Sequence, residues 1–376
     1  EGYKRMISDL QTRVYKTTNA GGTWTAVNTG LSMDEVLSLS GSAATGRVYL
    51  GTTAGVYRTM DAGATWQLKN TGMMSVSVYS VAIDPSDHDT VYAGTNSGVF
   101  KSSDRGESWT AVNEGLDDMM VSKVVIDPFD SATLYAGTYA GGVYVSTDGG
   151  ANWAAANSGL TDAVIMDLAI DHQTQGTLYA ATGRSGVFKS TDGGASWNQS
   201  NGGITQMEME SLVIDPDDAQ TLYAGSVSGV FKTTNGGAAW AASSTGLDSG
   251  FIRDLAIDPQ QPGMLYAVDG SAIYKSIDSG ALWTDLNFDQ GYFPEMVVVD
   301  PSNSDRLIVG TRGYGIYEST DGGKSWMVVN VALSENSLQV FDIIVSPSDP
   351  AVVYAGSFIG FYRSLDLQSF VPLAIK

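Results

Sequence analysis

The feature that most constrains this chain is the even spacing of its tryptophans. All eight stand 42 to 44 residues apart along 376 residues. A fixed period of this length indicates copies of one supersecondary unit, each burying its hydrophobic face against its neighbours. The eight positions are Trp24, Trp66, Trp109, Trp153, Trp197, Trp240, Trp283 and Trp326.

Four further positions keep register with each tryptophan. An aromatic residue stands nine positions before it, Ser or Thr seven before, Asp or Asn five before and Gly three before. The pattern predicts a strand, a turn and a second strand. The Asp side chain accepts backbone N–H groups within the turn, Gly takes a positive φ, and the buried Trp ring anchors the second strand.

Upstream of this turn, most copies hold two short β-branched runs separated by an Asp-Pro turn, as in SVAIDPSDHDTVYAGT at 80–95. Four strands in about 43 residues is the period of a propeller blade. We therefore expect an all-β chain, a single β-propeller domain over 1–376 with about nine four-stranded blades; eight blades and an open repeat array are the alternatives. The expected repeat units are approximately 1–30, 31–72, 73–115, 116–159, 160–203, 204–246, 247–289, 290–332 and 333–376.

The two terminal copies are incomplete. The segment RMIS at 5–8 aligns with VYAG at 91–94, so the first blade is expected to lack its innermost strand. The last copy has Phe370 where the tryptophan would stand. We expect the native chain to extend before Glu1 by about 15–25 residues, the length of a strand and turn in the other copies.

The unit [ST]-x-D-x-G-x-x-W resembles the Asp-box (BNR) repeat, over nearly the whole chain. Asp-boxes occur in sialidases, xyloglucan-cleaving glycoside hydrolases, sortilin-type receptors and photosystem II assembly factors. Regular repetition with VYAGT-like strands is most similar to the last three groups. The resemblance implies a propeller and many possible functions. Xyloglucanases resemble two facing propellers with a catalytic Asp from each, a cleft that a single ring does not supply.

Charge and cysteine content exclude several classes of protein. With 20 basic and 41 acidic residues the net charge is −21, which disfavours nucleic acid as a partner. The absence of Cys removes disulfides and Cys-ligated zinc. No run approaches the roughly 20 apolar residues of a membrane span. We expect a bacterial protein that is extracellular, periplasmic or at the cell surface, with its signal peptide outside this chain.

The repeated acids are expected to be structural, because a catalytic residue does not recur in every blade. Both histidines, His88 and His172, lie at or near Asp-Pro-type turns, and no serine has an evident base. We predict no catalytic residue, no cofactor and no metal. The predicted structural Asp-box acids are Asp61, Asp104, Asp148, Asp192, Asp278 and Asp321, and the predicted inner-turn acids are Asp84, Asp127, Asp171, Asp215, Asp258 and Asp300.

The loops that vary between copies are the candidate binding surface. In a propeller they share one face, opposite the Asp-box turns, and here they gather Met, aromatic and acidic residues, which suit adaptable contacts. The alternative is that the Met side chains fill the funnel wall and the acids are solvated. The expected binding residues are Met74, Tyr79, Asp117, Asp118, Met120, Tyr139, Arg184, Glu208, Glu210, Arg253, Tyr292, Glu295, Arg312, Tyr314 and Phe358.

Two smaller groups within this face have alternative readings. Glu208 and Glu210 alternate in a strand-like segment, so they would point the same way and could act as an acid and base or hold a cation. Arg184, Arg253 and Arg312 could bind a carboxylate, or could pair with neighbouring acids.

We therefore expect a non-catalytic binding or assembly module for a protein or peptide that is neutral or basic. The first alternative is a glycan-active protein resembling the xyloglucanases, with a polysaccharide as partner. The second is a structural cell-surface or filament subunit.

Overall fold

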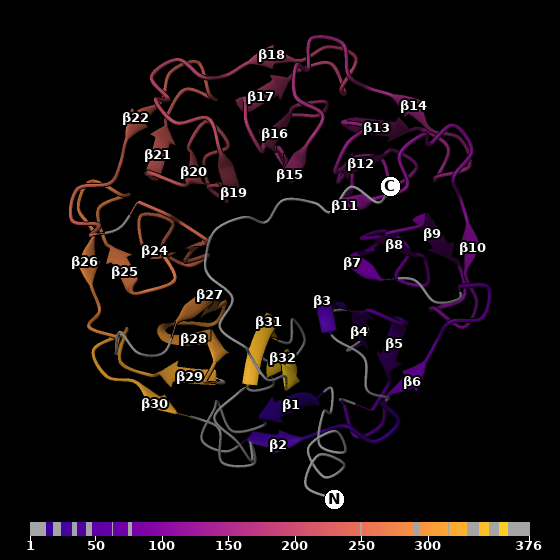
Figure 1. The fold of residues 1–376 in the computed structure, drawn as a ribbon, viewed down its shortest axis with the longest axis horizontal. Coiled ribbons are helices and arrows are strands. Elements are labelled where there is room, and N and C mark those ends of the chain that lie inside the picture. Colours follow the sequence, from indigo (N-terminus) through magenta and orange to yellow (C-terminus); the bar gives the residue numbers. More distant parts are fainter. Residues whose placement is uncertain are drawn as a thin grey trace, which may run out of the picture.

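Strands arranged as blades around a central axis make up the described chain (Figure 1). The computed structural model describes residues 13–17, 24–31, 36–42, 47–61, 63–73, 77–248, 250–288, 293–314, 316–328, 338–345 and 353–359. Within these ranges every element is a strand, numbered β1 to β32, and the expected all-β propeller is confirmed.

In seven sets of four antiparallel strands the chain runs outward in order, from the innermost strand to the outermost. The innermost strands are β3 (Val36–Ser42), β7 (Val78–Ile83), β11 (Val121–Ile126), β15 (Ile165–Ile170), β19 (Met209–Ile214), β23 (Asp254–Ile257) and β27 (Pro294–Asp300). The second strands are β4 (Arg47–Thr52), β8 (Val91–Thr95), β12 (Leu134–Thr138), β16 (Leu178–Thr182), β20 (Leu222–Ser226), β24 (Leu265–Val268) and β28 (Asn303–Gly313).

The third strands carry the repeated aromatic residue. They are β5 (Gly55–Thr59), β9 (Gly98–Ser102), β13 (Val143–Ser146), β17 (Gly186–Ser190), β21 (Gly229–Thr233), β25 (Ile273–Ser276) and β29 (Ile316–Ser319). The outermost strands are two residues long: β6 (Gln67–Leu68), β10 (Thr110–Ala111), β14 (Ala154–Ala155), β18 (Asn198–Gln199), β22 (Ala241–Ala242), β26 (Thr284–Asp285) and β30 (Met327–Val328). Such short edge strands offer little unpaired backbone to other chains.

The described strands form seven sheets, so the expectation of about nine blades is wrong. Six sheets have four strands, and the seventh has eight. The eight-stranded sheet joins β27–β30 to β31 (Leu338–Val345), β32 (Val353–Ile359), β1 (Arg13–Thr17) and β2 (Trp24–Ala26). The alternative of eight blades is closer, because this large sheet contains two sets of four strands.

The overcount has a physical cause. The first and last sequence copies are not separate blades, because β1 pairs antiparallel with β32 from Arg13↔Ser357 to Thr17↔Val353. This pairing closes the ring, so the open-array alternative is also wrong. The eleven-residue strand β28 then runs on to pair with β31 at Arg312↔Gln339, which merges two strand sets. The missing first strand and the extension before Glu1 lie outside the described residues and stay predictions.

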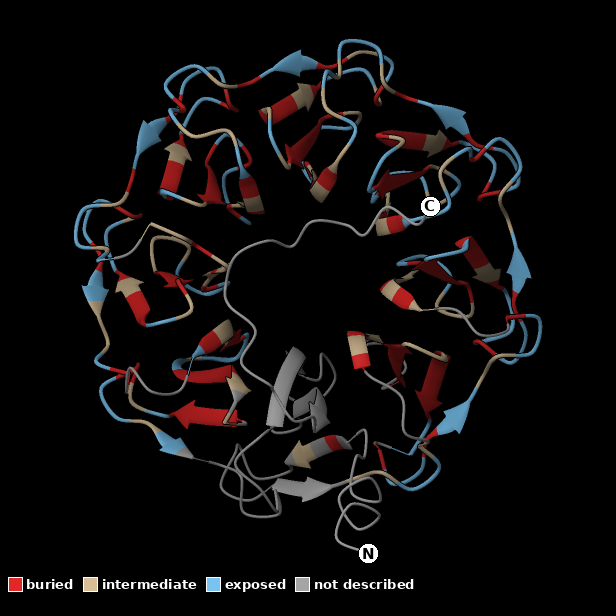
Figure 2. Cartoon of the chain, in the orientation of Figure 1, coloured by how far each residue is buried: buried red, intermediate tan, exposed pale blue. Residues whose placement is uncertain are grey.

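The hydrophobic core lies at the seams between neighbouring blades rather than inside single sheets. One cluster combines Tyr135 and Val143 of the β11–β14 sheet with Ile165, Leu178 and Trp197 of the β15–β18 sheet. Second strands are buried along their whole length, whereas the outer strands are exposed (Figure 2). A blade therefore depends on both neighbours for burial, as the sequence period implies.

The Asp-box turn is held by side-chain hydrogen bonds. In one copy the Ser146 hydroxyl donates to Asp148 Oδ1 and accepts the Gly150 amide, while the amide and side chain of Asn152 donate to Asp148 at 2.9 and 2.8 Å. The hydrogen bonds from Asn152 and Ser146 lower the pKa of Asp148 to about 2. This carboxylate is occupied by its own turn, as a turn-forming role requires.

A second seam contact explains why a basic residue follows the repeated aromatic. The Lys189 ammonium donates to the carbonyl of Gly236 in the next blade's Asp-box turn at 2.7 Å and lies 5.2 Å from the Tyr179 ring centroid. The Tyr179 hydroxyl donates to the same carbonyl at 3.2 Å. We call this trio the lysine latch. The same arrangement recurs at Lys101 and Lys232. At Lys275 the ammonium donates to the Gly322 carbonyl and lies over the Tyr266 ring, but the Tyr266 hydroxyl donates to Met264 Sδ instead.

Candidate binding face

The predicted binding residues lie at one end of the blades. Antiparallel order places the connections from second to third strand, and from outer strand to the next inner strand, at the end opposite the Asp-box turns. We call this the loop end. Met74 and Tyr292 lie outside the described residues, and Phe358 lies in β32 with only its backbone described.

Bulges at the start of the inner strands aim several of these side chains. The pairing register shifts across Tyr79 in β7, across Glu210 in β19 and across Glu295 in β27. A bulge inserts one unpaired residue and redirects its side chain, and bulges are common beside functional sites. Simple alternation therefore does not set the direction of Glu210, contrary to the expectation for Glu208 and Glu210.

One group of predicted residues meets between the β7–β10 and β11–β14 sheets. The rings of Tyr79 and Tyr139 stand edge to face, with centroids 6.3 Å apart and an interplanar angle of 84°. Burial, with a smaller contribution from Tyr79, raises the pKa of Tyr139. Met120 and its neighbour Met119 are exposed beside them, at 45% and 40%. The two predicted tyrosines are thus in contact here, and the binding role of this group stays a prediction.

The acids next to this group have different environments. Asp118 accepts the amides of Met120 at 3.1 Å and Ala140 at 2.8 Å, so it clamps two loops together. Asp162 does the same one blade on, accepting the amides of Val164 and Arg184. The Arg184 side chain is exposed and separate from the other two predicted arginines.

A second group lies across the ring, where β23, β27 and β28 begin or end (Figure 1). Glu295 is held between two guanidinium groups, 3.2 Å from Arg253 and 2.7 Å from Arg312. The Phe293 and Tyr314 rings lie 6.3 Å apart beside them. Both arginines therefore pair with a neighbouring acid, which is the salt-bridge alternative.

The Glu208 and Glu210 pair borders this second group. Burial raises the pKa of Glu210, the Arg253 cation opposes the rise, and the Glu208 charge adds to it. Glu208 itself is exposed. A carboxyl group with a raised pKa holds its proton at higher pH than an ordinary glutamate and is therefore a better general acid.

The inner strands carry a polar group that was not predicted from the sequence. Lys123 of β11 pairs with Asp167 of β15 at 3.1 Å, and Asp254 of β23 accepts the amide of Val297 at 3.0 Å. Burial raises the pKa of Asp254 to about 6, against hydrogen bonds from the Val297 and Leu255 amides. The sequence did contain a signal for this polar group, because charged residues interrupt aliphatic runs such as VSKVVI and IRDLAI.

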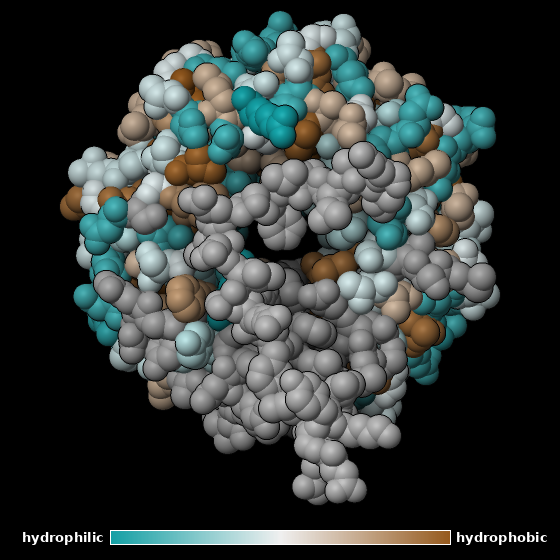
Figure 3. Space-filling view, viewed as in Figure 1, coloured by the Kyte–Doolittle hydropathy of each residue, from teal (hydrophilic) through white to brown (hydrophobic). Residues whose placement is uncertain are grey.

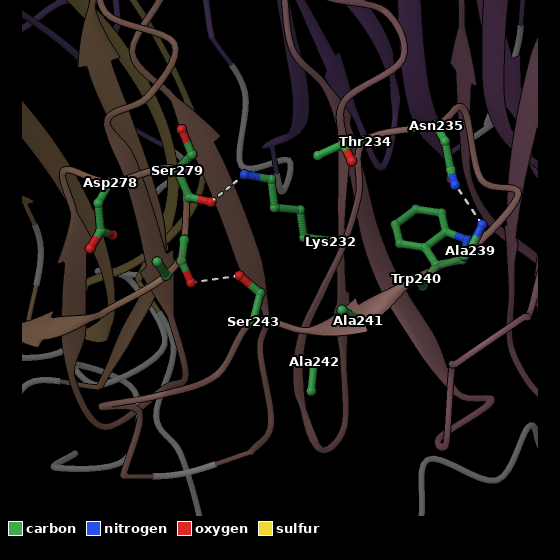
Figure 4. A pocket seen from close by; sticks show the side chains of 12 residues that line it. Lys232, Thr234, Asn235, Ala239, Trp240, Ala241, Ala242, Ser243, Asp278 and Ser279 are labelled. Atoms are coloured by element: carbon green, nitrogen blue, oxygen red, sulfur yellow. Dashed lines mark hydrogen bonds between the residues drawn. The ribbon is translucent and has the colours of Figure 1, made fainter.

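A groove between blades lies away from the loop end. It has a volume of about 380 Å³ and separates β22 from the next Asp-box turn. Figure 4 shows Lys232 donating to the Ser279 carbonyl at 2.8 Å and Ser243 donating to the Gly280 carbonyl at 2.6 Å along it. A similar groove of about 230 Å³ occurs one seam earlier, beside Lys189. Since latch residues line both grooves, they belong to the blade seams.

The described ranges limit the class of protein in two ways. No group of three or more His, Asp or Glu side chains there has the arrangement of a metal site. The same residues include no helix with the length and apolarity needed to cross a membrane. On the side shown in Figure 3, hydrophobic residues outside the grey atoms form small, separated patches.

Comparisons with known proteins place the chain among BNR-type propellers. The family described as photosynthesis system II assembly factor YCF48 matches residues 32–163. No curated protein sequence matches. The solved structures that resemble this fold include a GH74 xyloglucanase from Xanthomonas campestris, with 20% identity over 89% of this chain and 58% of that one, at a TM-score of 0.62.

Two further structures share the fold. YCF48 bound to D1 peptide has 17% identity over 77% of this chain and 94% of that one, at a TM-score of 0.57. The extracellular domain of the one-component system BT4673 from B. thetaiotaomicron has 16% identity over 77% of this chain and 39% of that one, at 0.59. The chain spans 58% of the length of the xyloglucanase. At these identities the similarity establishes the fold alone.

Proposed function

We propose that this Asp-box β-propeller is a non-catalytic binding or assembly module that engages a protein segment or peptide through its loop end. The observation that carries the proposal is the exposure of Met119, Met120 and Tyr139 on loops whose backbone is hydrogen-bonded in place. Exposed apolar groups on an ordered surface mark interaction sites. A propeller of the same fold, YCF48, is known with a D1 peptide bound, which supports a peptide as partner.

The charge of the chain and the relatives of its fold extend this proposal. A net charge of −21 favours neutral or basic partners and disfavours acidic ones. The extracellular domain of BT4673 shares the fold, which supports the expectation that this chain is exported.

Selection of peptides on the folded chain tests the function. A library of random displayed peptides is selected for binding to the folded chain. The selected peptides are then synthesised, and their dissociation constants are measured by fluorescence polarisation. We expect binders with dissociation constants of about 1–100 µM, weakened about tenfold by Tyr139→Ala or Phe293→Ala at the loop end. Ile277→Ala, at an exposed position beside an Asp-box turn, is the control and should leave binding unchanged. Failure to enrich any binder, or loss of binding only with Ile277→Ala, would refute the function.

A glycan-active protein is the second candidate. It is favoured by the raised pKa of Glu210 beside Glu208 and by the shared fold of the xyloglucanase. Release of reducing ends from xyloglucan, abolished by Glu210→Gln and kept by Asp117→Asn, would establish it. No release by the unchanged chain at high enzyme concentration would leave the binding function as the better account.

A further inference from the structure

The first group on the loop end forms a defined apolar patch. We call it the Tyr–Met patch: Met119, Met120 and Tyr139, with Tyr79 in edge-to-face contact with Tyr139 and Asp117 in the same loop as the methionines. The three exposed members have exposed fractions of 40%, 45% and 39%. Met119 and Met120 are consecutive, and the Met120 carbonyl accepts the Tyr139 amide, so the three exposed side chains leave adjoining backbone positions. Exposed apolar groups that lie together on a surface are candidates for contact with a partner.

The backbone beneath the patch is fixed by hydrogen bonds from three loops. The Met119 carbonyl accepts the Gly98 amide of the preceding blade at 2.8 Å, and the Met120 carbonyl accepts the Tyr139 amide at 3.0 Å. Asp118 adds its bonds to the amides of Met120 and Ala140. A partner would therefore meet a surface whose main chain is already ordered, which lowers the entropy cost of binding.

The electrostatic character of the patch is negative. Asp117 is exposed and makes no hydrogen bond or ion pair through its carboxylate within the described parts of the chain. Within the described ranges the Asp118 carboxylate accepts neutral amides, and no described cation pairs with it. Lys123, a few residues on, pairs with Asp167 at 3.1 Å on the inner strands. The exposed ring and the carboxylates of the patch therefore favour a positively charged side chain of a protein partner.

We propose that the Tyr–Met patch binds a lysine or arginine side chain of a partner segment, together with an adjoining apolar residue. In this proposal the cation lies against the partly exposed Tyr139 ring and close to Asp117, and the apolar neighbour packs on Met119 and Met120. A cation over an aromatic ring is attracted by the ring quadrupole, and Met adapts its shape to varied apolar groups. This subsite rests on the proposed function and gives it a partner class, a basic and apolar peptide segment.

The test uses the peptides selected above, each made in three forms. One form keeps its basic residue, one carries norleucine there, and one carries glutamate. We expect selected sequences to hold Lys or Arg beside an apolar residue. Replacement by norleucine should weaken binding by about three- to thirtyfold, the range of a cation–π contact with a nearby carboxylate. Asp117→Asn should weaken the basic form about threefold and leave the norleucine form unchanged.

Matched variants separate this subsite from the general function. Tyr139→Leu keeps apolar bulk and should remove the preference for the basic form, while Ile277→Ala, beside an Asp-box turn, should not alter it. Trp fluorescence and the unfolding temperature check that each variant is folded. If binders are lost with Arg312→Ala or Phe293→Ala, and Tyr139→Leu and Asp117→Asn leave the lysine preference intact, the subsite is refuted while the peptide-binding function stands. If no peptide binds at the loop end, both are refuted.

Discussion

Replacing Lys189 by methionine removes one lysine latch while keeping much of the apolar stem. The lost hydrogen bond runs from a charged donor to the Gly236 carbonyl at 2.7 Å, and bonds of this kind contribute about 1.5–3 kcal/mol. The lost contact with the Tyr179 ring, at 5.2 Å, adds about 0.5–2 kcal/mol.

Two effects offset this loss. The Tyr179 hydroxyl still donates to the Gly236 carbonyl at 3.2 Å, so the acceptor is not left without a partner. Burial lowers the pKa of Lys189, which reports a desolvation cost that methionine does not incur. We therefore expect the free energy of unfolding to fall by about 1–3 kcal/mol.

Urea unfolding followed by tryptophan fluorescence at neutral pH measures this change. For a chain of this length the loss corresponds to a drop in unfolding temperature of about 1–4 °C. Lys232→Met removes the equivalent latch at the next seam and should cost the same. Lys324→Met, at an exposed site, is the control and should stay within about 0.5 kcal/mol of the unchanged chain. A Lys189→Met variant as stable as this control would show that the latch contributes nothing and that the reasoning is wrong.

Three other changes have definite expected outcomes. Gly203→Ala should cost more than about 3 kcal/mol or prevent folding, because φ is 92° there and a Cβ would lie 2.0 Å from the Trp240 carbonyl oxygen. Asp254 has a folded pKa of about 6, above its unfolded value, so the folded chain binds more protons between about pH 4 and 6. Stability should therefore fall as pH rises through that window, by at most about 3 kcal/mol, and Asp254→Asn should flatten the dependence. Val145 in β13 occupies the position that holds the latch lysine in other blades, between a Tyr and an intact Asp-box turn. Val145→Lys should therefore add a latch at this seam and raise the urea midpoint.

The controls for these three use matched sites. Gly263→Ala meets only the Ser279 hydroxyl, at 3.3 Å, and should be tolerated. Asp217→Asn, at an exposed carboxylate, should leave the pH dependence of stability unchanged. Val145→Met should not stabilise as Val145→Lys does. Each expectation is contradicted if the control and the test variant behave alike under urea unfolding across the stated pH range.

The repeat pattern was sufficient to predict the blade. The even tryptophan spacing, the Asp-box turn and the β-branched runs each specify local structure, and strand, turn and buried ring follow from them without knowledge of the neighbours. The gathering of Tyr79 with Tyr139 could be expected only in outline, from loops that share an end of the blades. Their edge-to-face contact depends on a bulge in β7, and the strand pattern of the sequence does not predict this bulge.

The number of sheets and the identity of the seam contacts required the tertiary structure. Copies counted along the chain gave about nine units, but β1 pairs with β32 and β28 with β31, contacts between residues far apart in sequence. The same holds for Asp254, whose raised pKa arises from burial among strands of other blades. Local propensity and periodicity are properties of short segments, so they can be determined from the sequence alone. Ring closure, strand merging and the burial of a charge depend on which distant segments meet, and that is decided only when all the blades pack together.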